Sequence, residues 1–288
     1  MTKRLALFFV ALLFVGTVVA QKSLSRSELG LTGGGMNYIG DLNGQSMFGK
    51  ANLAGGLTAR YNFDTRWSLA LCGSYGHIEG GNPDIIARRN LSFRSKIVEG
   101  CIRAEFNFFP YGIDNRTQKA FTPFIFCGLG LFGFNPKALY ADTITGEPTW
   151  YDLQPLATEG QGTQAYPDRQ RYKLLDVYMP FGIGLRWRLS PAIHLSAEYG
   201  WRKTWNDYLD DVSTTYVGAD VLMAEDGGGA MAVRLADRSS EVQPGYVNAV
   251  GIKRGDDSLP DWYAYFNISL TFSMEMLFGW MRGKVCEQ

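Results

Sequence analysis

The residues from 193 to 202 alternate strictly between apolar and polar side chains, and this alternation limits the possible folds more than any other feature of the sequence. The apolar set is Ile193, Leu195, Ala197, Tyr199 and Trp201, and the polar set is His194, Ser196, Glu198, Gly200 and Arg202. A period of two is that of a β-strand. One face ends in Tyr and Trp while the other carries opposite charges, which is typical of a strand between lipid and a packed polar interior.

Five further segments repeat this alternation: residues 51–63, 66–77, 94–109, 179–189 and 262–272. Two weaker segments complete the set, a Gly-rich one at 28–41 and one at 121–132 that is apolar on both faces and gives no register. Beyond residue 20 no stretch reaches the roughly 18 apolar residues of a membrane-spanning helix. The sequence therefore predicts an all-β protein, an eight-stranded antiparallel transmembrane β-barrel.

The connections between these segments alternate in length. Short connections at 63–66, 110–119 and 189–192 alternate with longer ones, of which 135–176 and 205–261 are the longest. Outer-membrane barrels combine short periplasmic turns with long extracellular loops, so both termini are expected in the periplasm. We also expect short helices within residues 220–242 of the last loop, interrupted by Gly227, Gly228 and Gly229.

Charged residues recur on the polar faces of the predicted strands. They are Arg60, Glu99, Arg103, Glu105, Arg186, Glu198 and Arg202. A soluble lipocalin-like barrel would instead have a polar outside and an apolar interior. Because an unpaired buried charge costs several kcal/mol, we expect these residues to pair with one another inside a lumen filled by side chains.

The two ends of the chain have their own character. Lys3 and Arg4 precede an apolar run, and Val18 and Ala20 suit a signal-peptidase site, so residues 1–20 are predicted to be a cleaved signal peptide rather than a retained anchor. Residues 21–272 form the barrel in this interpretation, and 273–288 a periplasmic tail. Phe278 and Trp280 of the tail either line the membrane edge or contact a periplasmic partner.

The sequence offers little for catalysis or cofactor binding. Lys and Arg balance Asp and Glu at 28 each, which argues against nucleic acid as a partner. The glycines at 128, 130 and 133 match a dinucleotide-binding pattern, but no helix follows them. The two histidines, His77 and His194, are predicted at opposite ends of the barrel, so no catalytic triad is expected. We predict no enzyme activity, cofactor, metal or small-molecule substrate.

Two clusters leave alternatives open. Asp207, Asp210 and Asp211 would suit either a hard cation or the capping of backbone turns, and we expect capping. Cys72 and Cys101 fall on the same predicted face of adjacent strands, but the strand register is too uncertain to decide on a disulfide. The cysteines lack the paired spacing of a zinc site.

The run TWNDYLDDVSTTY at residues 204–216 resembles the PorG family of the Bacteroidetes type IX secretion system. The matching positions include Glu198, Gly200, Trp201 and Arg202, followed by a rim motif of Asp207, Tyr208, Asp210, Asp211 and Tyr216. The stretches ELGLTGGGMNYIGDLN, FTPFIFCGLGLFGFNPKA and LQPLATEGQG are similar as well. The resemblance covers nearly the whole chain after residue 20.

This resemblance implies a non-enzymatic component of a protein-export machine in the bacterial outer membrane. Its partners would be outer-membrane lipid and a periplasmic ring of a PorK-like lipoprotein and a PorN-like protein, which the barrel would anchor to the membrane. Two alternatives remain: a small pore, and a surface-binding barrel, either an adhesin or an enzyme, that acts through the long external loops. We expect the rim motif at the external face.

Overall fold

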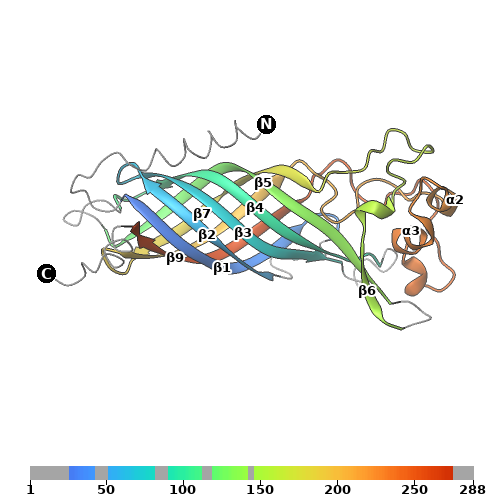
Figure 1. Ribbon diagram of the computed structural model, residues 1–288, viewed down its shortest axis with the longest axis horizontal. Coiled ribbons are helices and arrows are strands. Elements are labelled where there is room, and N and C mark those ends of the chain that lie inside the picture. Colours follow the sequence, from blue (N-terminus) through green and yellow to red (C-terminus); the bar gives the residue numbers. More distant parts are fainter. Residues whose placement is uncertain (1–25, 43–50, 82–89, 112–118, 142–145, 275–288) are drawn as a thin grey trace, which may run out of the picture.

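The computed structural model describes residues 26–42, 51–81, 90–111, 119–141 and 146–274, and shows one closed barrel with an elaborated end (Figure 1). The predicted signal peptide, Phe278 and Trp280 lie outside the described residues. Within the described residues no helix is long and apolar enough to cross a membrane.

Eight strands form the barrel: β1 (Ser27–Ile39), β2 (Asn52–Asn62), β3 (Trp67–Gly80), β4 (Phe93–Asn107), β5 (Phe121–Ala141), β7 (Leu175–Arg188), β8 (Ile193–Thr204) and β9 (Trp262–Ser273). Each pairs antiparallel with the next, and β1 pairs with β9 to close the sheet. The predicted eight-stranded antiparallel barrel is confirmed. Short connections lie at one end, here called the turn end, and long ones at the other, the loop end.

The outer face of the barrel is apolar. Leu57, Leu129 and Ile183 are 64%, 68% and 58% exposed, and many other large apolar side chains share this surface. Tyr61, Phe63, Trp67 and Phe108 add exposed aromatic rings near the turn end. A soluble monomer rarely exposes so continuous an apolar surface, whereas a membrane barrel carries an apolar band edged by aromatic residues. The barrel is therefore a transmembrane one.

Strand β5 departs from the sequence-based expectation. It runs from Phe121 to Ala141 instead of ending near residue 132, and its last residues pair with a further strand, β6 (Pro148–Asp152), beyond the barrel wall. A proline inside a strand usually marks an edge or an end, and Pro136 lies in this extension. Here Pro136 still lies opposite Ser95 of β4, so the strand continues past it.

Glycines on β7 make room for bulky rings on β5. Phe126 lies opposite Gly182, and Phe124 lies opposite Gly184. A Cβ atom at Gly182 would lie 2.7 Å from the Phe126 ring, and one at Gly184 would lie 2.5 Å from the Phe124 ring. The rings therefore point into the lumen, which explains why β5 is apolar on both faces.

The last long loop contains the short helices that the sequence predicts. They are α2 (Ala219–Met223) and α3 (Gly229–Ala236), followed by a 3₁₀ turn, η2 (Ser239–Glu241); another such turn, η1 (Gln154–Leu156), follows β6. These elements gather at the loop end together with β6 (Figure 1). We call the two loops there, residues 153–174 and 205–261, the cap.

Candidate functional site

The lumen near the turn end is filled by a charge network of four arginines and four glutamates. Glu105 is at its centre: its carboxylate accepts hydrogen bonds from Arg60 Nε at 2.7 Å, Arg103 Nε at 3.0 Å and Arg186 Nη2 at 2.7 Å. The Glu105 side chain is fully buried, and the three arginines are at most 3% exposed. Such burial is tolerated only because each charge has opposite charges and hydrogen-bond donors around it.

The remaining members extend this network across the barrel. Arg103 donates two hydrogen bonds to Glu198, at 2.8 and 2.7 Å, from β4 to β8. Arg202 Nη2 donates a hydrogen bond to Glu99 Oε1 at 3.4 Å. Arg60 Nη1 donates to Glu28 Oε2 at 2.7 Å, and this glutamate was missed in the sequence because its strand is Gly-rich and weakly alternating.

Two lumen arginines also pack on aromatic rings of β5. The Arg103 guanidinium carbon lies 4.3 Å from the centre of the Phe126 ring, and that of Arg186 lies 4.4 Å from the centre of the Phe124 ring. A cation over a ring face is stabilised by the ring quadrupole, more so away from water. The β5 rings are therefore part of the polar interior, which apolar–polar alternation does not reveal.

Above the charge network the lumen becomes aromatic and apolar. Met36, Ile97, Phe132, Tyr178 and Tyr263 are completely buried there. Tyr263 links the two layers, because its hydroxyl donates to Glu99 at 2.5 Å. Described side chains thus fill the lumen from the charge network to the cap.

The rim motif begins the cap and fastens it to the barrel wall. Tyr38 of β1 places its hydroxyl 2.7 Å from Asp210 Oδ2 and 2.6 Å from Asp261 Oδ1. The Tyr38 hydroxyl is thus a hydrogen-bond partner of both carboxyl groups. Burial raises the pKa of both Asp210 and Asp261 well above the usual range. Asp210 Oδ1 also accepts from the Val212 backbone N–H at 2.9 Å, as a turn-capping aspartate does.

Asp211 joins the two cap loops. Its carboxylate accepts from Thr158 at 2.5 Å and from the Tyr172 hydroxyl at 2.7 Å, both in the loop that follows β6. The backbone at Asp211 is left-handed, with φ of 66°, which aspartate tolerates better than most residues. Burial raises the pKa of Asp211 to about 6, against the opposing effect of Arg254.

Glu159, in the loop that follows β6, also binds the last loop. Its carboxylate accepts from the backbone N–H groups of Ser213 and Thr214, each at 2.9 Å, and from the Thr214 hydroxyl at 2.6 Å. Arg254 Nη1 donates to the same carboxylate at 2.9 Å, and Arg254 Nε donates to the Ala236 carbonyl at 3.1 Å. Neither Glu159 nor Arg254 was singled out in the sequence, because each lies in a loop without periodicity.

The aromatic residues of the motif pack within the cap. Tyr208 stacks on Tyr172 with ring centres 4.8 Å apart, and Tyr172 stacks in turn on Phe134 of β5. Tyr216 pairs through its backbone with Ile252 and Gly251. Asp207 is half-buried, and this burial, together with the nearby carboxylates of Asp41, Glu159 and Asp257, raises its pKa to about 7.

Asp210 and Asp211 of the rim motif thus hydrogen-bond other residues of the protein. Asp210 and Asp211 turn toward different partners, and among the described residues no group of three or more His, Cys, Asp or Glu side chains could hold a metal ion. His194 is buried and lies 2.8 Å from the Tyr111 hydroxyl through Nδ1, whereas His77 is near the other end of the barrel in β3. The two histidines do not meet.

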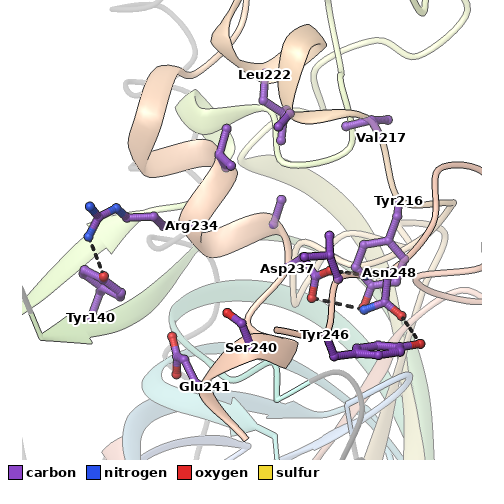
Figure 2. Close-up of a pocket in the computed structure, with 14 residues that line it drawn as sticks. Tyr140, Tyr216, Val217, Leu222, Arg234, Asp237, Ser240, Glu241, Tyr246 and Asn248 are labelled. Atoms are coloured by element: carbon purple, nitrogen blue, oxygen red, sulfur yellow. Dashed lines mark hydrogen bonds between the residues drawn. The ribbon is translucent and has the colours of Figure 1, made fainter. Parts of the chain in front are cut away.

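A pocket of about 300 Å³ opens in the cap between α2, α3 and the end of β5 (Figure 2). Leu222, Val217 and Val233 give it an apolar side. Arg234 Nη1 donates a hydrogen bond to the Tyr140 hydroxyl at 2.7 Å (Figure 2). The Asn248 side-chain amide donates to Asp237 Oδ1 at 3.1 Å. The pocket combines apolar side chains with a few polar ones, as small binding sites do.

Comparison with solved structures finds other small barrels at low similarity. The chain is similar to Neisserial surface protein A (NspA), with 9% identity over 88% of this chain and 100% of that one, at a TM-score of 0.38. It is also similar to Ail, the attachment invasion locus protein of Yersinia pestis, with 9% identity over 85% and 96% of the two chains and a TM-score of 0.38. OprG from Pseudomonas aeruginosa is 11% identical over 86% and 97%, with a TM-score of 0.36.

No curated protein matches the sequence. One family model does match, over residues 3–149, which is just over half of the 288 residues. Its region takes in β1 to β5 and so five of the eight members of the charge network, but it ends before the cap. This transmembrane barrel belongs to the family described as a domain of unknown function, DUF6089.

Proposed function

We propose that this protein is a non-enzymatic barrel of the bacterial outer membrane and a scaffold of the type IX secretion machinery. In this role it anchors a periplasmic ring of PorK-like and PorN-like proteins to the membrane. The resemblance of residues 204–216 to the PorG family supports the choice of machinery. The filled lumen supports a scaffold over a transporter.

The filled lumen is the single observation on which the scaffold role depends. Glu105 alone binds three arginines, and Glu198 binds Arg103 through two hydrogen bonds. A solute could pass only if these buried pairs separated, and exposing one charge without its partner costs several kcal/mol. A barrel of this kind acts through its outer surfaces, and the pore alternative is accordingly disfavoured.

The orientation proposed for the barrel places the cap outside the cell and the turn end, with both termini, in the periplasm. A periplasmic ring then reaches only the short turns and the tail that contains Phe278 and Trp280. An epitope inserted after Asp168 in the cap should bind antibody on intact cells, and one inserted in the turn at Asp64 should not. The reverse pattern would put the cap in the periplasm and contradict this orientation.

The scaffold role is tested by detergent pull-down from cells that contain the secretion machinery. The full chain should bring down the ring proteins, and so should a variant in which residues 219–236 of the cap are replaced by a short linker. A version ending at Met274 keeps all of β9 and should recover much less of the ring if the tail is the contact. Absence of ring proteins from the full-chain sample would refute the proposal.

A surface-binding role is the second candidate, because the cap is a built structure with a pocket of about 300 Å³ instead of a simple connection. In this case the variant lacking residues 219–236 should lose attachment to its surface ligand while protein secretion continues. Loss of secretion in that variant, with the barrel still assembled, would count against a purely surface-binding role.

A further inference from the structure

Cys72 of β3 and Cys101 of β4 lie directly opposite each other in the sheet. The structure shows the pair in its reduced form. Cys101 alternates with the inward-facing Glu99 and Arg103, and Cys72 alternates with the inward-facing Ala70. The register that the sequence left undecided therefore places both side chains in the lumen as cross-strand partners.

The geometry of such a pair suits a disulfide. Directly opposed residues of antiparallel strands have Cα atoms about 4.5–5.5 Å apart, which is inside the range of about 4.4–6.8 Å that a disulfide spans. Both side chains lie on the lumen side of the sheet, where the paired positions bring them next to each other. Thr58 of β2 donates to the Cys72 sulfur at 3.7 Å, and a disulfide sulfur could still accept that bond. The spacing typical of directly opposed strand residues therefore lies within the reach of a disulfide.

The pairing is also selective. Cys127 of β5 is exposed on the outer face, where its partner on β4 is Ala104. Cys101 faces Gly130 on its other flank, which carries no side chain to compete for the sulfur. Cys286 lies outside the described residues. Among the described cysteines, strand alternation therefore separates Cys127 from the lumen pair.

We propose that Cys72 and Cys101 form a disulfide that fixes the register of the β3–β4 pair during assembly of the barrel. One cysteine thiolate attacks the disulfide of an oxidising thiol–disulfide exchange protein, which gives a mixed disulfide. The second thiolate then attacks the cysteine sulfur of that mixed disulfide and releases the reduced exchange protein. The barrel loses two electrons and two protons, and the exchange protein, whose disulfide becomes two thiols, gains both the electrons and the protons.

Burial dictates when this reaction occurs. In the closed barrel Cys101 is 6% exposed and lies among packed lumen side chains, so an exchange protein has no access to it. An exported chain passes through an oxidising compartment before its barrel closes, and disulfides persist in such compartments. A register slip of one residue would turn the charged residues of β4 toward lipid, so a covalent link at this point would exclude the slip.

The test uses the full-length protein in its own membrane. Free thiols are blocked with N-ethylmaleimide under denaturing conditions at harvest, and the protein is digested and analysed by mass spectrometry without reductant. We expect a linked peptide pair containing Cys72 and Cys101. The Cys127→Ser variant should keep this link, and Cys101→Ser should leave Cys72 labelled by maleimide. Maleimide on both Cys72 and Cys101 of the natural sequence, or a link from Cys72 to Cys127 or Cys286, overturns the proposal.

Timing provides a second measurement that does not depend on a variant folding. Dithiothreitol added during synthesis should abolish the link, whereas the same treatment of assembled membranes should leave it intact because the sulfurs are buried. A link that forms only after assembly, or one that reductant removes equally at both stages, would contradict formation before barrel closure.

Discussion

Glu105 shows how a single residue can determine whether the barrel interior is stable. It accepts hydrogen bonds from three arginines, and no water is needed to complete the contacts of its two oxygens. Glu79 of β3 offers a contrast, because it pairs with Arg94 at 3.4 Å while both side chains remain partly exposed. The same kind of charge pair has different energetic consequences in the two places.

Glu105→Gln should lower the free energy of unfolding by about 3–5 kcal/mol, since it leaves three buried arginines facing a neutral amide. Glu79→Gln is the matched control and should cost less than about 1 kcal/mol. Urea unfolding in detergent micelles, followed by tryptophan fluorescence, measures both. Equal costs for the two variants would mean that the lumen pairs are hydrated.

The pH dependence of the cap also depends on individual residues, Asp207 in particular. Its pKa rises from an ordinary value of 3.8 to about 7 in the folded cap, mainly through burial. The folded form therefore holds an extra proton between these values, and the cap loses that stabilisation as the pH rises through about 7. Hydrogen exchange of residues 205–218, corrected for intrinsic rates, should be faster at pH 8 than at pH 6.

Asp207→Asn should reduce this difference between the two pH values, because its side chain cannot ionise. Asp168→Asn, a change at an exposed position of the other cap loop, should leave the difference unchanged. Protection that increases at pH 8 in the unaltered protein would reverse the sign and exclude Asp207 as the group responsible.

At the scale of strands and loops, a small number of contacts hold the two loops of the cap together. Glu159 lies just after η1, and its carboxylate accepts from two backbone N–H groups of the last loop and from Arg254. None of these bonds involves the barrel wall. The cap and the barrel should therefore respond separately to changes at Glu159.

Glu159→Gln should lower the local free energy of cap opening by about 3 kcal/mol, because it leaves the buried Arg254 without its closest carboxylate. Trypsin cleavage in the cap, which contains Arg169, Arg171 and Lys173, should then become roughly a hundred times faster. The exposed Glu147→Gln serves as control and should leave cleavage unchanged. A parallel loss of barrel stability in Glu159→Gln would show that the two units are not independent.

The elements differ in how well the sequence predicted them, for physical reasons. Strands such as β8 and β9 separate lipid from a polar lumen, so apolar and polar residues alternate along their sequences. Strand β5 places Phe124 and Phe126 inside against arginines, and this removes the alternation. Cap contacts such as Glu159 with Arg254 join residues 95 positions apart, and no local pattern encodes them. The rim motif was located by resemblance, and its partners came only from the fold.

At the scale of the whole molecule, exposed apolar residues occur both on the barrel wall and in the cap, and these two regions lie in different surroundings. Leu129 is 68% exposed on the barrel wall, opposite Ile102 of β4 and inside the apolar belt. Val250 is 61% exposed in the cap. In water the two positions would be equivalent, whereas in a membrane only Leu129 faces hydrocarbon.

Leu129→Arg should therefore destabilise the barrel in lipid by about 2–4 kcal/mol, the cost of placing a cation on the lipid face of a barrel near the membrane centre. Val250→Arg changes a side chain of similar exposure and should remain within about 0.5 kcal/mol of the natural protein. Reversible unfolding from phosphatidylcholine vesicles would measure both, with Leu129→Ala as a control for lost apolar contact. If the two arginine variants had the same small effect, the apolar belt would not face lipid, and the exposed leucines of β2, β3 and β5 would need another partner to cover them.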